Sequence, residues 1–458
     1  RNVAVLGHGG AGKTTLVDAL CFASGTSRRK GNVEEGHSLT MTTPEELDHG
    51  ISLQTTPAFA EVKGTKVNLL DTPGFLDFTG DALAAVRVAD AALIVVGSTS
   101  GVEVGTEVVW KYCEERSLPR MFFVSMMDKE HADFDKVFQD IKDRLASNVL
   151  PVEVPIGKGD DFTGIINLFT ERAHVFKEGS LTGEYEESEI PEELKETFEE
   201  MEMEFIETIA TADEDLLERY LEGETISKEE AIEAMAKGMA MGEIVPLFCG
   251  SAKLSYGVQT LLGKMVELFP HPGEMPGEKA ARPGLDQEVT LQADDSGPPT
   301  ALIFKTATEP HVGELSFFKV LSGVLDNGME LKNAERKVSE KLNHLSIPLG
   351  KERLEVPRLH AGDIGVVAKM RDSHTNDTLS SPDRPMTVRG VNFPKPDISV
   401  AVHGKNRSDD DKLGEVLGKI NEEDPTFSHV FNAELGQTIC RGLGELHLNV
   451  QFERMERK

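Results

Sequence analysis

Short apolar runs alternate with helix-like patterns through the first half of the chain. The runs have the length of buried strands, and strands that alternate with helices predict a mostly parallel, doubly wound α/β sheet. The predicted strands are Val3–Leu6, Val67–Leu70, Ala92–Val96, Met121–Ser125 and Ile244–Phe248. The predicted helices are Lys13–Ala23, Gly80–Val88, Glu103–Glu115, Asp133–Leu145 and Gly257–Phe269.

An acidic segment interrupts this alternation. Residues 178–233 contain 22 Asp and Glu against 3 Lys and Arg, so they carry −19 of the net charge of −31. Apolar residues within the segment recur at spacings of three and four, which marks one face of a helix: Leu194, Phe198, Met201, Phe205 and Ile209. The favoured interpretation is an amphipathic helix with a solvated acidic face, and the alternative is a docking surface for a basic partner protein. We predict that residues 158–242 are an insertion in the first domain.

The pattern changes after residue 270. A linker rich in Pro, Gly and charged residues extends to Pro299, and closely spaced short strands without helices follow, which predicts a small β-barrel. Its predicted strands are Ala301–Lys305, Leu315–Leu321, Glu330–Leu331, Lys341–Leu345 and Gly365–Lys369.

A third unit begins near Met386. Its order of strand, helix, two strands and helix predicts a split βαβ unit of the ferredoxin-like α+β kind. The elements are Ile398–Val402, Asp409–Glu423, Phe427–Glu434, Gln437–Arg441 and a helix from Glu445 to the end. The predicted fold class is therefore multidomain, with an α/β domain at 1–280, a β-barrel domain at 281–385 and an α+β domain at 386–458.

Composition sets limits on the class of protein. A chain of 458 residues is long enough for about three domains, and 39% hydrophobic with 28% charged residues is ordinary for a globular protein. No apolar run approaches the ~20 residues of a membrane-spanning helix, so we expect no membrane partner. The net charge argues against nucleic acid, but the acidic segment dominates that total. The four separated cysteines form no CxxC pair, which suits a reducing cytoplasm.

The strongest chemical motif follows the first strand. Gly7-His8-Gly9-Gly10-Ala11-Gly12-Lys13-Thr14 fits GxxxxGK[ST] between a strand and a helix, the context that a phosphate-binding P-loop requires. Its glycines let backbone N–H groups approach phosphate oxygens, and the following helix adds its positive N-terminal end. We predict that Lys13 neutralises the β- and γ-phosphates and that the Thr14 hydroxyl ligates Mg²⁺.

Two further segments end predicted strands on the P-loop side of the sheet. Asp71-Thr72-Pro73-Gly74 alone is compatible with a simple turn, but after a P-loop it predicts a magnesium-linked Asp71 and a Gly74 N–H that contacts a γ-phosphate. Asp128 ends another predicted strand, in Ser125-Met126-Met127-Asp128, and its carboxylate can accept from guanine N1–H and N2–H₂ together. Gly250-Ser251-Ala252-Lys253 would support the base from the other side. In isolation, Asp128 is equally compatible with a helix N-cap.

These residues resemble those of a translational GTPase, and most closely those of elongation factor G. The resemblance is in order and nearly continuous along the chain. The matching stretches are residues 7–15 including Thr15, 71–74, 77–80, 249–253, 257–259 and Gly-Leu-Gly-Glu-Leu-His-Leu at 442–448. It implies GTP or GDP with Mg²⁺ as cofactors, the ribosome as partner, and a monomer that acts in the cytoplasm. The family has two further C-terminal domains that this sequence, ending at Lys458, lacks, so we expect a fragment or a partly ordered chain, with natural truncation as the alternative.

Several positions depart from the family pattern. Phe75 stands where members usually carry the His that positions the attacking water, and a phenyl ring cannot orient water. With Phe75 at this position, we expect hydrolysis to be slowed by roughly 10²–10⁴-fold. The alternative is that Phe75 is a hydrophobic gate and that another group, such as His49 or a ribosomal one, holds the water. Ser125-Met126-Met127-Asp128 replaces Asn-Lys-x-Asp, which predicts weaker binding or looser base choice. Ser52 keeps a hydroxyl for Mg²⁺, while Gly10 replaces an Asp.

The resemblance leaves several functional hypotheses open. The leading one is a GTP-binding factor that hydrolyses GTP on the ribosome to drive translocation or ribosome recycling. The second, motivated by Phe75, is a GTP-gated ribosome-binding factor with little or no hydrolysis. The third is a ribosome protection or release factor built on the same nucleotide domain, and the fourth is a P-loop enzyme that does not act on the ribosome.

Overall fold

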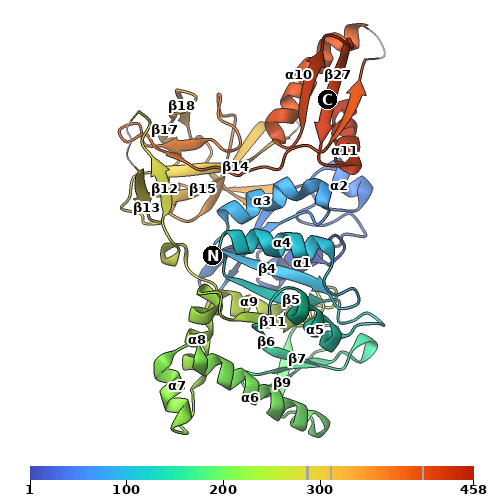
Figure 1. Cartoon of the computed structure of the whole chain (residues 1–458), viewed down its shortest axis with the longest axis vertical. Helices are drawn as coiled ribbons and strands as arrows, with labels where there is room; N and C mark the ends of the chain where they lie inside the picture. Colours follow the sequence, from blue (N-terminus) through green and yellow to red (C-terminus); the bar gives the residue numbers. More distant parts are fainter. Residues whose placement is uncertain (285–287, 310–311, 405–406, 458) are drawn as a thin grey trace.

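The computed structural model describes residues 1–284, 288–309, 312–404 and 407–457, with the backbone alone for 407–411. It shows three units in chain order, an α/β unit, a β-rich unit and an α+β unit, so the predicted multidomain fold class is confirmed (Figure 1). The end of the last predicted helix, Lys458, lies outside the described residues. No described helix is long and apolar enough to span a membrane.

The first unit is built on a seven-stranded sheet in the order β2-β3-β1-β4-β5-β11-β6. β2 pairs antiparallel with β3, and the remaining pairs are parallel, as the sequence predicts. The strands are β1 Asn2–Leu6, β2 Thr56–Val62, β3 Thr65–Asp71, β4 Ala91–Gly97, β5 Arg120–Ser125, β6 Val149–Pro151 and β11 Val245–Cys249. The edge strands β2 and β6 are absent from the sequence-based prediction.

Helices cover both faces of this sheet, because alternate strand residues point to opposite sides. Apolar residues of α3, α4 and α5 join one buried cluster, and those of α1 and α9 join the other. The helices are α1 Lys13–Ala23, α2 Pro44–His49, α3 Thr79–Val88, α4 Val104–Glu115, α5 Phe134–Arg144 and α9 Val258–Leu268. The short α2 is also missing from the prediction.

Residues 153–240 form a lobe between β6 and β11, at the bottom of Figure 1. Its four strands pair in the order β10-β9-β8-β7, and three helices follow. The elements are β7 Glu153–Ile156, β8 Gly164–Asn167, β9 Arg172–Phe176, β10 Tyr185–Ser188, α6 Lys195–Thr211, α7 Glu214–Leu221 and α8 Lys228–Ala240. On α6, Phe205 and Ile209 are buried and Phe198 and Met201 pack partly against the same core, so the predicted apolar face lies on a helix.

The second unit is an eight-stranded sheet in the order β18-β17-β23-β14-β15-β22-β19-β20. Its strands are β14 Thr300–Glu309, β15 Gly313–Ser322, β17 Glu330–Asn333, β18 Val338–Lys341, β19 Ser346–Leu349, β20 Glu352–Glu355, β22 Ile364–Ala368 and β23 Thr378–Ser380. The predicted strand Lys341–Leu345 is wrong, because β18 ends at Lys341 and His344 takes a left-handed φ of 56° in the turn before β19.

Part of the predicted linker is also ordered into strands. β12 Glu278–Ala281 pairs with β13 Glu288–Leu291 and with β24 Thr387–Val388, which returns from the far end of the second unit. A two-stranded ladder joins β16 Leu325–Asp326 to β21 Arg358–Leu359. The proline-rich composition therefore conceals short strands, one of which pairs with a partner about a hundred residues away in sequence.

The third unit has the predicted order of elements. β25 Ile398–Val402, β26 Ser428–Asn432 and β27 Gln437–Gly442 pair antiparallel with β27 in the centre. α10 Arg407–Glu423 and α11 Glu445–Arg457 pack on the sheet through a small core that includes Leu417, Ile420 and Leu448. In Figure 1 this unit lies beside α2 and α3 of the first unit.

Candidate nucleotide-binding site

The P-loop wraps between β1 and α1 in a backbone path that only glycine allows. Gly7 has a φ of 144°, and a Cβ atom there would lie 2.3 Å from the carbonyl oxygen of Val95. Gly12 precedes α1 with a φ of 90°. The loop therefore opens at the C-terminal edge of the parallel strands, where ligands of doubly wound sheets bind.

Lys13 is the buried cation of this loop. Its Nζ donates to the carbonyl oxygens of Gly7 and His8, at 3.0 and 2.8 Å. Burial lowers the pKa of Lys13 to about 8, although the Asp71 and Glu103 carboxylates oppose that shift. A buried ammonium held at the mouth of the loop is well placed to contact phosphate oxygens.

A carboxylate and three hydroxyl groups gather beside Lys13. Thr14 Oγ1 lies 2.8 Å from Ser52 Oγ, and Thr40 Oγ1 donates to Asp71 Oδ2 at 2.6 Å. Burial raises the pKa of Asp71 to about 7, against the opposing effects of Thr40, Lys13 and Thr14. The other carboxylate oxygen, Oδ1, is buried without a hydrogen-bond partner among the described residues.

This oxygen cluster fits a magnesium ion. Mg²⁺ prefers oxygen ligands at about 2.1 Å in octahedral geometry, which places neighbouring ligands roughly 3 Å apart, close to the Thr14–Ser52 separation. The unpartnered Oδ1 of Asp71 supplies the acceptor that a metal-bound water needs. The three predicted metal-linked residues Thr14, Ser52 and Asp71 thus lie together, although they come from separate segments of the sequence.

Gly74 and Phe75 lie directly against the P-loop. A Cβ atom on Gly74 would come within 2.3 Å of Lys13 Nζ and 2.5 Å of the Gly9 nitrogen, so only glycine fits here. The Phe75 ring packs on Gly9, where a Cβ would lie 3.0 Å from Cε2, and Phe75 is 38% exposed. The residue in place of the family histidine therefore covers the loop with an apolar ring.

The predicted base-binding segments also converge on the P-loop. Ser125 Oγ donates to the Ala11 carbonyl at 2.6 Å, and the Met126 methyl group would lie 3.2 Å from a Cβ on Gly12. Met126 takes a left-handed φ of 61°, and the next N–H, that of Met127, donates to the Gly250 carbonyl at 3.1 Å. These contacts join the two predicted base loops, with Asp128 half-exposed beside them.

The remaining predicted residues have different surroundings. The Thr72 hydroxyl donates to the Val5 carbonyl at 2.7 Å, so this side chain is bonded to strand β1 of the sheet. Ser251 and Ala252 are buried, whereas Lys253 is exposed and its carbonyl accepts from Lys30 Nζ at 2.7 Å. Thr15 lies on α1 and Pro73 in the turn after β3. His49 Nε2 lies 2.9 Å from Glu453 Oε2, so this histidine is engaged with the third unit.

The segments that border the site also contact the third unit. Asp77 Oδ2 accepts from the His447 backbone N–H at 3.1 Å, and the Phe78 ring meets the His447 ring edge-on at 5.8 Å. Leu53, next to Ser52, shares a buried apolar cluster with Val450. Residues on both sides of the proposed phosphate site are therefore tied to α11.

Sequence reasoning missed Thr40, Lys30 and Glu103. Thr40 donates a hydrogen bond to Asp71, Lys30 donates one to the Lys253 carbonyl, and Glu103 Oε1 lies 3.5 Å from His8 Nε2. Thr40 and Lys30 lie in the irregular segment between α1 and α2, which has no hydrophobic period to interpret. Their contacts depend on tertiary folding, and no local pattern indicates them.

The fold and the site define a P-loop nucleotide-binding protein with two further units, and the comparisons identify its family. The model of the elongation factor Tu GTP-binding domain matches residues 1–271. The models of elongation factor G domain 2 and domain III match residues 298–382 and 393–458. The chain belongs to the translational GTPases of the elongation factor G type.

A solved structure agrees with this assignment. The crystal structure of a protein from Thermus thermophilus is 34% identical in sequence and superposes with a TM-score of 0.89. The match covers 100% of this chain and 66% of the Thermus chain. The present chain thus spans about two thirds of the length of that structure.

Proposed function

We propose that this chain binds GTP or GDP with Mg²⁺ and hydrolyses GTP on the ribosome, driving translocation or ribosome recycling as a cytoplasmic monomer. The observation that carries the proposal is the cluster of Lys13, Thr14, Ser52 and Asp71 around the P-loop, with one unpartnered Asp71 oxygen. Family membership supports guanine as the base and the ribosome as the partner.

Each residue has a defined part in this mechanism. The P-loop N–H groups and Lys13 hold the phosphates, and the N–H of Gly74 reaches a γ-phosphate if one is present. Thr14 and Ser52 would ligate Mg²⁺ and Asp71 would hold it through water, and the ion when bound neutralises charge on the β- and γ-phosphates. Met126 covers the base and Asp128 accepts its N–H donors.

The contacts with α11 explain how nucleotide state would reach the rest of the molecule. Ser52 follows α2, whose acidic residues Glu45 and Asp48 pair with Arg457 of α11. Asp77 and Phe78 follow Gly74 and contact His447. A γ-phosphate that orders both segments therefore biases the position of the third unit, which is the usual route of a GTPase switch.

Phe75 favours a second candidate function, a GTP-gated ribosome-binding factor with little hydrolysis. Its ring lies on Gly9, it offers no hydrogen bond to a water, and His49 is engaged with Glu453. In this form of the proposal, GTP controls ribosome occupancy, and turnover is slow. The two candidates share the nucleotide site and differ only in the chemical step.

Binding measurements test the proposed site. Equilibrium titrations of the chain with GTP and ATP, with and without Mg²⁺, should show magnesium-dependent binding that prefers GTP. Asp128→Ala should lose most of this preference, about tenfold or more, because the paired N–H donors of guanine lose their acceptor. Glu130→Ala, an exposed neighbour, is the matched control. Equal affinity for both nucleotides in the unmodified chain would refute the guanine assignment, and failure to co-sediment with ribosomes in any nucleotide state would refute the ribosomal role.

A further inference from the structure

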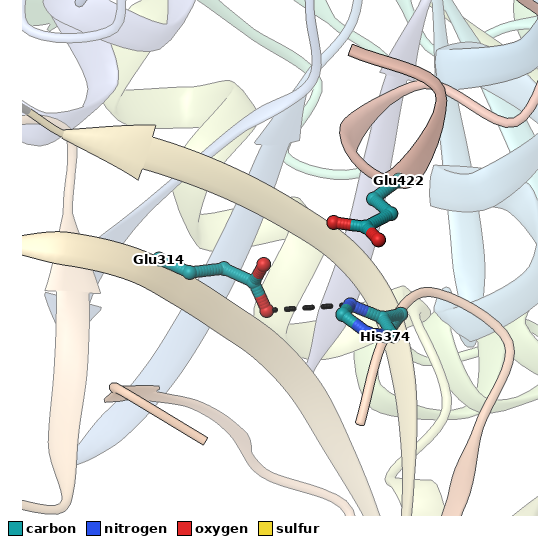
Figure 2. Close-up of side chains that lie close together, drawn as sticks. All are labelled: Glu314, His374 and Glu422. Atoms are coloured by element: carbon teal, nitrogen blue, oxygen red, sulfur yellow. Dashed lines mark ion pairs between the residues drawn. The ribbon is translucent and has the colours of Figure 1, made fainter. Parts of the chain in front are cut away.

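A second cluster of possible metal ligands lies between the second and third units. Glu314 of β15, His374 of the loop before β23 and Glu422 at the end of α10 point toward one another (Figure 2). One ligand atom from each residue lies within 4.8 Å of the others, and His374 Nδ1 is 3.5 Å from Glu314 Oε1. None of these residues belongs to the nucleotide site.

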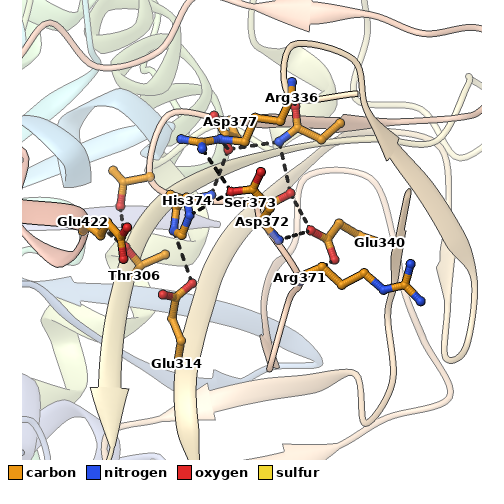
Figure 3. A network of polar contacts seen from close by, with 12 residues as sticks. Thr306, Glu314, Arg336, Glu340, Arg371, Asp372, Ser373, His374, Asp377 and Glu422 are labelled. Carbon is orange, nitrogen blue, oxygen red and sulfur yellow. Dashed lines mark hydrogen bonds and ion pairs between the residues drawn. The ribbon is translucent and has the colours of Figure 1, made fainter. Parts of the chain in front are cut away.

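The loop that carries His374 is fixed by two buried carboxylates (Figure 3). Glu340 accepts from the backbone N–H groups of Arg371 and Asp372 and from the Ser373 hydroxyl, at 2.8 to 3.0 Å. Asp377 accepts from the backbone N–H of His374 at 2.8 Å. A loop anchored at successive residues holds the imidazole in place before any ligand binds, which is what a metal site requires.

The orientation of the imidazole leaves one nitrogen for a ligand. His374 Nε2 lies 3.4 Å from Asp372 Oδ1, and Arg336 holds that carboxylate at 3.2 Å. The other nitrogen, Nδ1, faces Glu314, is buried and makes no hydrogen bond among the described residues. A carboxylate on the far nitrogen is the usual support of a metal-bound histidine, because it fixes the tautomer and the ring orientation.

Glu422 is held against the second unit through its backbone. Thr306 Oγ1 of β14 donates to the Glu422 carbonyl at 3.1 Å and lies 2.9 Å from Thr375 Oγ1. This carbonyl lies at the C-terminal end of α10, where the helix dipole favours a positive charge. The carboxylates of Glu314 and Glu422 therefore lie close to the His374 ring, and Glu422 stands at the negative end of a helix.

We propose that Glu314, His374 and Glu422 bind a divalent transition-metal ion, best matched by Zn²⁺, that clamps the second unit to the third. Zinc accepts both imidazole nitrogen and carboxylate oxygen as ligands, so one nitrogen and two carboxylates with a water would complete a four-coordinate site. Ligands of tetrahedral zinc stand roughly 3.4 Å apart, so the glutamate side chains close by about 1 Å on binding. The half-exposed Glu314 and exposed Glu422 have the freedom to do so.

Zinc binding by the purified chain tests this proposal. After treatment with a chelator and dialysis, titration calorimetry with ZnCl₂ should show one site, and elemental analysis should give about one zinc per chain. His374→Gln and Glu422→Gln should each weaken binding at least tenfold, and Asp372→Asn by about 10–100-fold because it supports the ligand. His344→Gln changes an exposed histidine of the same unit that also faces a carboxylate, and it should leave binding unchanged.

Hydrogen exchange distinguishes the loss of a zinc ligand from a loss of folding. Zinc should slow amide exchange in β14 and at the end of α10 in the unmodified chain but not in Glu422→Gln, whose exposed side chain is unnecessary for folding. Equal zinc affinity in the unmodified chain, His374→Gln and Glu422→Gln would overturn the proposal. Absence of any site tighter than surface binding would also overturn it and leave His374 as an ion-pair partner of Glu314.

Discussion

The side chain and position of Phe75 bear directly on the hydrolysis step. It follows Gly74, which touches Lys13, and its ring lies on Gly9 of the P-loop. A group that orients the attacking water must accept or donate a hydrogen bond, and a phenyl ring does neither in the ordinary sense. We therefore propose that Phe75 alters the chemical step of GTP hydrolysis.

Replacing Phe75 by histidine should restore a water-orienting group at the phosphate end of the loop. We expect Phe75→His to raise ribosome-stimulated GTP hydrolysis by about 10²-fold, the lower end of what such groups contribute. Turnover under saturating GTP is the measurement. Leu76→His, at the exposed neighbouring position, is the control and should not raise the rate. An unchanged rate for Phe75→His would show that another group positions the water.

At the same scale, the sequence predicts the site only where a motif is local. Lys13 and Thr14 open helix α1 directly after the glycine-rich loop, so the strand, the glycines and the helix are enough to place them. The Thr40 bond to Asp71 joins residues 31 positions apart and depends on how an irregular segment folds back. The metal role of Ser52 was inferred only from the family resemblance. The structure places its hydroxyl 2.8 Å from that of Thr14, and metal binding by the pair stays a prediction.

Helix α11 is the element that connects the nucleotide site to the third unit. His447 is fully buried, and its Nε2 lies 2.7 Å from Asp424 Oδ2 while its Nδ1 accepts from the Leu443 N–H at 3.0 Å. Burial alone would raise the pKa of the Asp424 carboxyl, but the hydrogen bonds that it accepts from His447 and Thr426 outweigh burial and lower the pKa. The segment 442–448 therefore packs within the third unit through His447 and also contacts Asp77 of the first unit.

His447→Ala should destabilise the third unit by about 2 kcal/mol, because the largely buried Asp424 loses one of its hydrogen-bond donors and keeps Gln451 and Thr426. Hydrogen exchange of the β27 amides at neutral pH is the measurement, with the exposed His403→Ala as control. Because the pKa of Asp424 is lowered, its stabilisation is present above the unfolded value of about 4 and is lost as the pH falls through the folded value. Unchanged protection in His447→Ala would contradict this account.

Strand β7 carries a buried carboxylic acid that makes stability depend on pH. Glu153 is fully buried, and burial raises its pKa to about 8. Between about pH 5 and 8 the unfolded chain releases this proton while the folded chain keeps it, so stability falls as the pH rises, by up to about 1.4 kcal/mol per pH unit.

Glu153→Gln should flatten this dependence. We expect the thermal midpoint of the first unit to fall less between about pH 5 and 8 in Glu153→Gln than in the unmodified chain. Glu193→Gln, at an exposed position, should retain the original slope. The slope distinguishes titration from a simple packing defect, which lowers the midpoint equally at each pH. Equal slopes in all three proteins would show that Glu153 does not titrate in this range.

The sequence predicted helices and strands accurately where the hydrophobic period or the apolar run was long. The central strands and flanking helices of the first unit agree with the structure within one or two residues, because burial on both faces gives continuous apolar runs. β6 is too short for such a run, and β12 pairs with β24 across more than a hundred residues. The error at Lys341–Leu345 arose because the apolar Leu342 and Leu345 are buried in a turn.

At the scale of the whole molecule, buried polar contacts join the first and second units. Asp90 Oδ1 pairs with Lys319 Nζ at 2.5 Å, and the Asn2 side chain, which donates to Asp90, also donates to the Gly362 carbonyl at 2.5 Å. Lys305 donates to the Gln54 side chain and to the Thr55 carbonyl, three residues beyond Ser52. The segment that completes the proposed magnesium site is thus held by the second unit and by α11 of the third.

Contacts from the second and third units thus reach the segments that border the nucleotide site, and we propose that this site turns over GTP on the ribosome. The most direct test is GTP hydrolysis by this chain with and without ribosomes, with ATP as the matched substrate. The account predicts turnover that ribosomes stimulate and that is specific to GTP. Tight GTP binding without ribosome-stimulated turnover would contradict the hydrolytic role and leave a nucleotide-gated binding factor.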